Sequence, residues 1–121
     1  MKISTIRELL NAEVLAGEAN LGHHVYSACG SDMMSDVLAY VKDQAVLLTG
    51  LINAQVIRTA EMMDMVCIVF VRSKRPTPDM IRLAEESGLV LLATDKRMYE
   101  ACGLLYSSGL VGNKIRENGH G

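Results

Sequence analysis

Apolar positions along the chain fall into two alternating patterns, continuous short runs and segments with helical spacing. The continuous runs cover residues 25–29, 45–48, 66–71 and 89–93. None of them shows the polar alternation of a strand that has one face in solvent. Continuous apolar strands are typical of a sheet that is covered on both faces. We therefore expect these four runs to form buried strands.

The segments between the runs carry apolar residues at the spacing of an amphipathic helix. The four stripes are Met34, Val37, Leu38 and Val41; Val56, Ile57, Ala60 and Met63; Ile81, Leu83 and Ala84; and Met98, Ala101, Cys102 and Leu105. Strands that alternate with helices of about ten residues favour crossover units and a mostly parallel sheet. The pattern predicts a single three-layer α/β/α domain over residues 1–112, with a flexible polar tail at 113–121.

Local signals predict where several elements begin and end. The sequence from Thr5 to Glu8 fits a capping box, which would start a first helix at Thr5. Residues 14–15 read as a short extended piece, and residues 17–22 as a surface loop. Thr77-Pro78 suits the first positions of a helix, and Gly88 suits a left-handed residue after its last turn.

Composition limits the classes of function. The 121 residues carry a formal net charge of −2 and are 50% hydrophobic. An acidic balance gives no general attraction to nucleic acid or to an anionic membrane surface. The apolar runs are far shorter than the roughly 20 residues of a spanning helix, and no signal peptide is recognised at the N-terminus. We expect a cytoplasmic protein with no nucleic-acid or membrane partner.

The cysteines and histidines do not form a pattern of metal ligands. Cys29, Cys67 and Cys102 are widely spaced and include no C-x-x-C pair. We interpret them as reduced thiols in the core, while a redox role stays open. Neighbouring residues of a strand point to opposite faces, so His23 and His24 are not expected to share a metal.

Polar and charged residues follow the predicted strands, and they would meet at one edge of a parallel sheet beside helix N-termini. The candidate ligand-binding residues are Ser31, Asp32, Thr49, Gly50, Asn53, Arg72, Ser73, Lys74, Thr94 and Lys96. Hydroxyls and cations of this kind could hold an anion such as a phosphate.

A plainer interpretation of the same residues stays open. Loops between strands and helices use Gly, Ser, Thr, Asp and Asn as turn and cap residues in any such fold. Asp32 and Asp95 also oppose a highly charged phosphate unless they pair with the cations. No GxGxxG, GxxxxGK[ST] or GxSxG motif is present, so neither dinucleotide nor Walker-type binding is indicated. A phosphotransferase would have only Asp32, Asp95 and the cysteines as loose candidates.

The order of several segments resembles a stand-alone DRTGG domain over about residues 2–110. The segments that carry the resemblance are Glu13 to Glu18, Ser31 to Ala39, Leu48 to Gly50, Gln55-Val56, Ala84 to Glu86, Leu92 to Thr94 and Tyr99 to Gly103. The namesake residues of the family would fall near 50–53 and 71–73. Because this chain has Gly-Leu-Ile-Asn and Val-Arg-Ser there, the resemblance transfers no ligand.

The resemblance implies a fold like the N-terminal domain of HPr kinase/phosphorylase. Similar domains accompany CBS domains in some inorganic pyrophosphatases and occur in some phosphate acetyltransferases, where they are regulatory or dimerising units and catalysis lies elsewhere. Stand-alone members are often encoded near iron hydrogenase genes. We therefore expect a regulatory or interaction module that forms a homodimer, meets a partner protein of the redox or hydrogenase-associated class, and has no catalytic residue, metal or cofactor. The alternative is a sensor that binds a nucleotide or another phosphate-containing ligand at the edge of the sheet.

Overall fold

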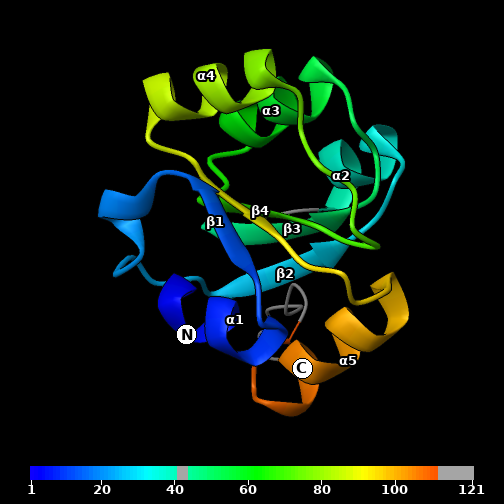
Figure 1. The fold of residues 1–121 in the computed structure, drawn as a ribbon. Coiled ribbons are helices and arrows are strands. Elements are labelled where there is room, and N and C mark those ends of the chain that lie inside the picture. Colours follow the sequence, from blue (N-terminus) through cyan, green and yellow to red (C-terminus); the bar gives the residue numbers. More distant parts are fainter. Residues whose placement is uncertain (41–43, 112–121) are drawn as a thin grey trace.

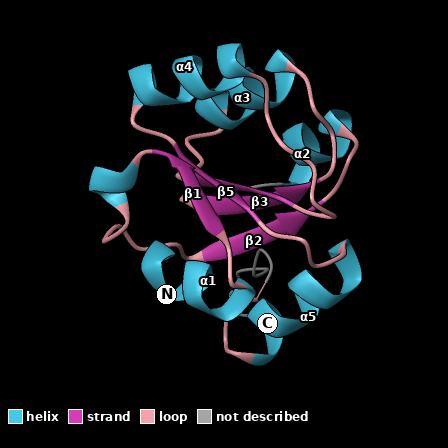
Figure 2. Ribbon diagram, in the orientation of Figure 1, coloured by secondary structure: helices cyan, strands magenta, loops and turns pink. Residues whose placement is uncertain are grey.

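Five strands form one sheet that lies between two layers of helices in the computed structural model, which describes residues 1–40 and 44–111 (Figures 1 and 2). The strands are β1 (Glu13–Ala16), β2 (Ser27–Gly30), β3 (Ala45–Thr49), β4 (Cys67–Phe70) and β5 (Val90–Ala93). The helices are α1 (Ile3–Leu10), α2 (Met34–Tyr40), α3 (Ala54–Met62), α4 (Pro78–Ser87) and α5 (Met98–Ser107), with a short 3-10 helix, η1 (Glu18–Asn20).

The strand order is β1-β5-β4-β3-β2. Strands β2 to β5 pair in parallel, and β1 joins β5 in the antiparallel direction. Each parallel strand is followed by a helix, so the chain returns to the same edge before it starts the next strand. The predicted three-layer α/β/α fold with a mostly parallel sheet is confirmed.

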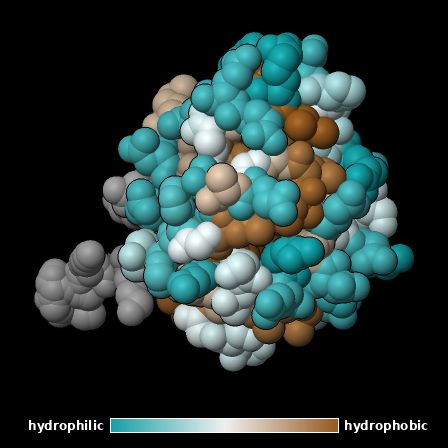
Figure 3. Space-filling view, turned by 60° about the vertical axis from the view of Figure 1, so that its left-hand side comes forward, coloured by the Kyte–Doolittle hydropathy of each residue, from teal (hydrophilic) through white to brown (hydrophobic). Residues whose placement is uncertain are grey.

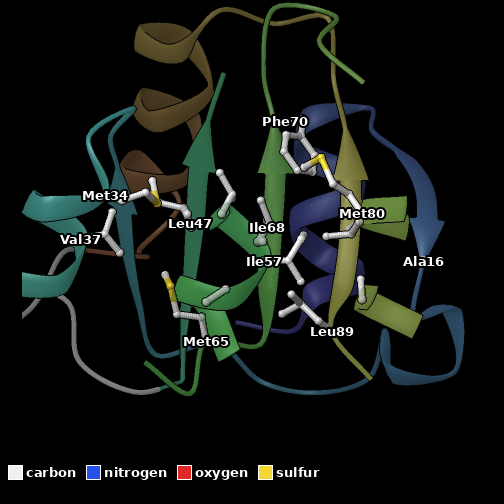
Figure 4. Close-up of a cluster of buried hydrophobic side chains, with 14 of the residues drawn as sticks. Ala16, Met34, Val37, Leu47, Ile57, Met65, Ile68, Phe70, Met80 and Leu89 are labelled. Atoms are coloured by element: carbon white, nitrogen blue, oxygen red, sulfur yellow. The ribbon is translucent and has the colours of Figure 1, made fainter. Parts of the chain in front are cut away.

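Each face of the sheet has its own apolar core. On one face Leu47 and Ile68 belong to the cluster that also contains residues of α2, α3 and α4, shown in Figure 4. On the other face Leu48 and Val69 belong to the cluster with α1 and α5. All residues of β3, β4 and β5 are buried, as the continuous apolar runs predicted.

One edge of the sheet is the short strand β1, whose residues change from exposed at Glu13 to buried at Ala16. Its pairing with β5 shifts register between Val14 and Ala16. Figure 3 turns this side of the molecule forward and shows hydrophobic surface in the middle of a hydrophilic surround. A short edge strand with an irregular register is a poor template for further strand pairing.

The predicted start of the first helix was wrong. Helix α1 begins at Ile3, its N-cap is Lys2, and Lys2 gives no side-chain cap, so Thr5 lies inside the helix. The free amides of the first turn are satisfied by the chain that follows η1: Ile3 N donates to the His23 carbonyl at 3.0 Å, and Ser4 N to the Leu21 carbonyl at 2.9 Å. A capping box is not required where a distant loop supplies the acceptors.

Both ends of α4 follow the sequence prediction. The Thr77 hydroxyl accepts a hydrogen bond from Met80 N at 3.2 Å, and Pro78 occupies the first turn. Gly88 ends the helix with a left-handed φ of 76°. Helix α3 has a similar cap, in which the Asn53 side chain accepts from Val56 N at 3.3 Å.

Thr77→Ala is expected to lower the free energy of unfolding by about 1 kcal/mol, because the amide of Met80 loses its acceptor. Urea denaturation followed by circular dichroism measures the change. Thr77→Ser keeps the hydroxyl and should stay near the wild type, and an equal loss in both variants would contradict the capping role.

Three other sequence predictions concern the loop at residues 17–22, Val41 and the C-terminal tail. The loop at residues 17–22 contains η1. Val41 of the first helical stripe and the predicted flexible tail at 113–121 lie outside the described residues. Among the residues that the structure describes, no helix has the length and apolar character needed to cross a membrane.

Candidate functional site

The predicted site residues stand at the carboxyl edge of the parallel strands, but they do not form one continuous pocket. Asp32, Thr49, Gly50 and Arg72 make a cluster around a single carboxylate. Ser73, Thr94 and Lys96 make a second group, at the end of β5. Ser31 and Asn53 serve their own loop and helix. Lys74 is exposed.

The first cluster is built around Asp32, on the loop between β2 and α2. Its Oδ1 accepts hydrogen bonds from Thr49 Oγ1 at 2.9 Å and from Gly50 N at 2.7 Å. Its Oδ2 lies 3.5 Å from the Arg72 guanidinium. Two segments that are far from Asp32 in the sequence, at residues 49–50 and at residue 72, thus place a hydroxyl, an amide and a guanidinium around one carboxylate.

Arg72 is positioned by a tight turn at the end of β4. Arg72 and Ser73 both have a φ of 60°, and Lys74 N donates to the Val71 carbonyl at 3.1 Å, which is the pattern of a type I′ turn. Such turns favour Asn and Gly, so two other residues there carry strain. The guanidinium lies over Gly50, so a Cβ at this position would collide with it unless the Arg72 side chain moved.

Most polar groups of Ser73, Thr94 and Lys96 already form hydrogen bonds with the backbone. Thr94 is buried, its hydroxyl donates to the Leu10 carbonyl at 2.8 Å, and it accepts from Lys96 N at 3.2 Å. Ser73 N donates to the Thr94 carbonyl at 3.0 Å. Lys96 Nζ lies 4.0 Å from Glu100. For Thr94 the turn and cap interpretation is the better one.

Ser31 and Asn53 also have local roles. Met33 N donates to the Ser31 hydroxyl at 2.9 Å, which closes a turn before α2. Asn53 caps α3, as described above. Their polar groups serve the backbone of their own loops, whereas the Asp32 carboxylate accepts from segments that are far from it in the sequence.

A shallow cavity of about 290 Å³ lies at the end of β5, where β1 begins. Its lining residues are Asn11, Glu13, Ser73, Arg75, Ala93, Thr94 and Asp95. Glu13 Oε1 and Arg75 Nη1 are 3.0 Å apart, and this pairing lowers the pKa of Glu13. The sequence prediction omitted Asn11, Glu13 and Arg75. The only signal for their place was the short extended piece at 14–15, which gave no partner strand.

The cysteines are poor candidates for nucleophiles. Burial raises the pKa of Cys67, and desolvation is also the main reason why the pKa values of Cys29 and Cys102 are raised. A thiol with a raised pKa holds little thiolate at neutral pH. Within residues 1–40 and 44–111 no group of three or more His, Cys, Asp or Glu could hold a metal ion.

Helix α5 has an exposed face that is rich in aromatic residues. Tyr99 is 93% exposed and Tyr106 is 65% exposed. Gly103 lies between them on the same face, and no heavy atom would come within 4 Å of a Cβ there. A shallow, mostly apolar groove of about 550 Å³ runs along this part of the helix.

Two comparisons match this fold to known proteins. The family described as the DRTGG domain matches residues 5–108. The crystal structure of the CBS and DRTGG domains of the regulatory region of Clostridium perfringens pyrophosphatase, complexed with its activator diadenosine tetraphosphate, superimposes with a TM-score of 0.71 at 15% sequence identity. The match covers 98% of this chain and 51% of the other, so the chain spans about half of that protein. A comparison with curated proteins found no match.

Proposed function

Because this chain belongs to the DRTGG domain family, whose members are regulatory modules, we propose that it regulates a partner by binding and carries out no chemistry of its own. The site geometry supports this proposal. The carboxylate that could serve as a base, Asp32, already accepts hydrogen bonds from Thr49 and Gly50 and pairs with Arg72, and the thiols have raised pKa values. A catalyst needs a nucleophile or base that is free to reach a substrate.

The module acts as a homodimer in this proposal, and the observation that carries it is the exposed face of α5. Tyr99, Gly103 and Tyr106 occupy adjacent positions on this face. Exposed aromatic residues are enriched in interfaces, and Gly103 would let a second helix approach closely. Glu100, the one charged residue of α5, pairs with Lys96. A face with so little net charge can meet its own copy across a two-fold axis without repulsion.

The double variant Tyr99→Ser/Tyr106→Ser is expected to weaken self-association by about tenfold or more, because interface tyrosines each contribute on the order of 1 kcal/mol or more. Sedimentation equilibrium over a range of protein concentrations measures the dissociation constant. Tyr26→Ser is the matched control, since Tyr26 is 68% exposed, stacks with His24 and is not part of α5. A wild-type monomer at all concentrations would contradict the dimer, and an equal effect of Tyr26→Ser would contradict this interface.

The partner and the cellular location are further parts of the proposal. The family resemblance favours a redox or hydrogenase-associated protein as the partner and the cytoplasm as the location. The likeness to the N-terminal domain of HPr kinase/phosphorylase also remains a prediction. Affinity capture from cells with the tagged wild type and with the Tyr99→Ser/Tyr106→Ser variant would separate partners that require the α5 face from those that do not.

A second candidate function is a sensor of phosphate-containing ligands, and the Asp32 cluster favours it. Thr49, Gly50 and Arg72 converge on an oxyanion, which is the group such ligands share. The structural neighbour was solved with a nucleotide activator, although the chain reproduces only part of that protein. A thermal-shift screen with ATP, ADP, AMP, phosphate and acetyl phosphate tests the sensor. A ligand-induced shift that is lost in Arg72→Ala/Lys74→Ala would support it, and no shift with any ligand would reject it.

A further inference from the structure

We infer that Asp32 is a tethered anion in an oxyanion site formed by Thr49, Gly50 and Arg72, and that a ligand binds by displacing its carboxylate. The ligand class is a small molecule with a phosphoryl or carboxylate group. The inference rests on the sensor function proposed above and adds how that site is regulated: the protein's own side chain keeps it closed.

The two neutral donors are fixed before any ligand arrives. Thr49 is fully buried at the end of β3, and its Oγ1 accepts a hydrogen bond from Leu51 N at 3.1 Å. The bond from Leu51 N uses a lone pair of the Thr49 hydroxyl, so the hydroxyl proton remains available to donate to Asp32 Oδ1. Gly50 N donates to the same oxygen. An oxyanion in this place would meet two donors whose directions are set by the sheet.

The third donor is charged and only loosely engaged. The distance of 3.5 Å between the Arg72 guanidinium and Asp32 Oδ2 exceeds the 2.7–2.9 Å that is typical of a charge-assisted hydrogen bond. Both side chains are nearly half exposed, at 45% and 48%. The backbone of Arg72, in contrast, is held firmly, because its amide donates to the Lys96 carbonyl at 2.8 Å. Arg72 can therefore exchange one anion for another while its turn stays in place.

Asp32 can leave the site without disturbing the core. It lies on an exposed loop, and the next residue, Met33, is 60% exposed. The apolar packing of α2 begins only at Met34. Displacement of the Asp32 carboxylate thus exposes three donors and opens no cavity among apolar side chains.

A purely structural role for the cluster makes a different prediction. If Asp32 only ties the loop before α2 to the loop after β3, its removal would lower stability and create no affinity for anions. If it is a tethered anion, its removal would leave three donors without an acceptor, and an added oxyanion would replace it. The two roles therefore differ in the response to an added anion.

The test compares Asp32→Ala with Asp36→Ala by isothermal titration calorimetry with inorganic phosphate at constant ionic strength. Asp36→Ala removes the same charge from the first turn of α2 and leaves the three donors untouched. We expect Asp32→Ala to bind phosphate about tenfold or more tightly than Asp36→Ala does. Adding Arg72→Ala to Asp32→Ala should abolish the gain. A parallel titration with acetate distinguishes a phosphoryl site from a carboxylate site.

A second variant at Asp32 and the amide resonance of Gly50 provide two further tests. If Asp32→Ala does not fold, the isosteric Asp32→Asn replaces it. An added oxyanion then competes only with a neutral amide oxygen for Thr49, Gly50 and Arg72, so phosphate should still bind more tightly than to Asp36→Ala. In the wild type, the amide resonance of Gly50 should move when a bound ligand displaces the carboxylate. Phosphate affinity of Asp32→Ala no greater than that of Asp36→Ala, or a ligand that binds the wild type without moving the Gly50 resonance, would overturn the inference. If no ligand shifts the melting temperature of the wild type but Asp32→Ala binds phosphate more tightly than Asp36→Ala does, the sensor function is rejected. The oxyanion site formed by Thr49, Gly50 and Arg72 is then still supported.

Discussion

Gly17→Ala is expected to lower the free energy of unfolding by about 2 to 4 kcal/mol. Gly17 has a φ of 75°, which disfavours any side chain. A Cβ at this position would also lie 2.7 Å from the Leu89 carbonyl oxygen and 2.8 Å from the Val90 Cα. These atoms belong to the start of β5, so the backbone of a central element would have to move.

Urea denaturation of Gly17→Ala gives the change in stability from the shift in midpoint. Gly22→Ala is the matched control, because no heavy atom would lie within 4 Å of its Cβ and its φ is not in the left-handed region. That variant should remain within about 0.5 kcal/mol of the wild type. Similar losses in both variants would show that the contact between Gly17 and β5 is not the cause.

Phe70→Ala is expected to destabilise the domain by about 3 to 5 kcal/mol. Phe70 is fully buried, is the only phenylalanine of the chain, and lies on the sheet face covered by α2, α3 and α4. The neighbours on that face, among them Met80 and Ile68, would line the cavity left by the ring (Figure 4). Chemical denaturation measures this loss. Phe70→Leu fills most of the space and should cost clearly less, whereas equal costs would contradict a cavity effect.

The sequence predicted the central strands and their layers because strands that are buried on both faces lack polar positions. Residues 45–48, 66–71 and 89–93 contain no polar position that could face water, and only a covered sheet explains this. The left-handed residue at Gly88 and the cap at Thr77 were also predicted, since both depend on neighbours within a few residues. Local rules therefore sufficed wherever the structure is governed by local contacts.

The missed features depend on contacts between distant segments. The start of α1 is set by carbonyls at Leu21 and His23, which the sequence around Thr5 does not reveal. Strand β1 is short and partly exposed, so nothing in residues 13–16 indicated that it pairs antiparallel with β5. That placement brings Glu13 to the carboxyl edge beside Arg75, which is why Glu13 was absent from the predicted site.

The candidate site was predicted in position and not in detail. Parallel strands bring Thr49, Gly50 and Arg72 to one edge, and that much follows from topology. The sequence allows Asp32 to pair with one of the nearby cations, and the structure shows this pairing with Arg72. The left-handed turn that aims Arg72 over Gly50 could not be predicted, because two residues other than glycine or asparagine rarely occupy it.

We propose that the chain acts by binding, as a homodimer that meets through α5. The most direct measurement is a dilution series of two-dimensional ¹H–¹⁵N NMR spectra of the wild type, from millimolar to low micromolar protein. If two copies meet through α5, resonances of residues 98–107 should move together with concentration while those on the exposed side of α4 stay in place. Spectra that do not change with concentration, with the relaxation rates of a monomer throughout, would contradict it.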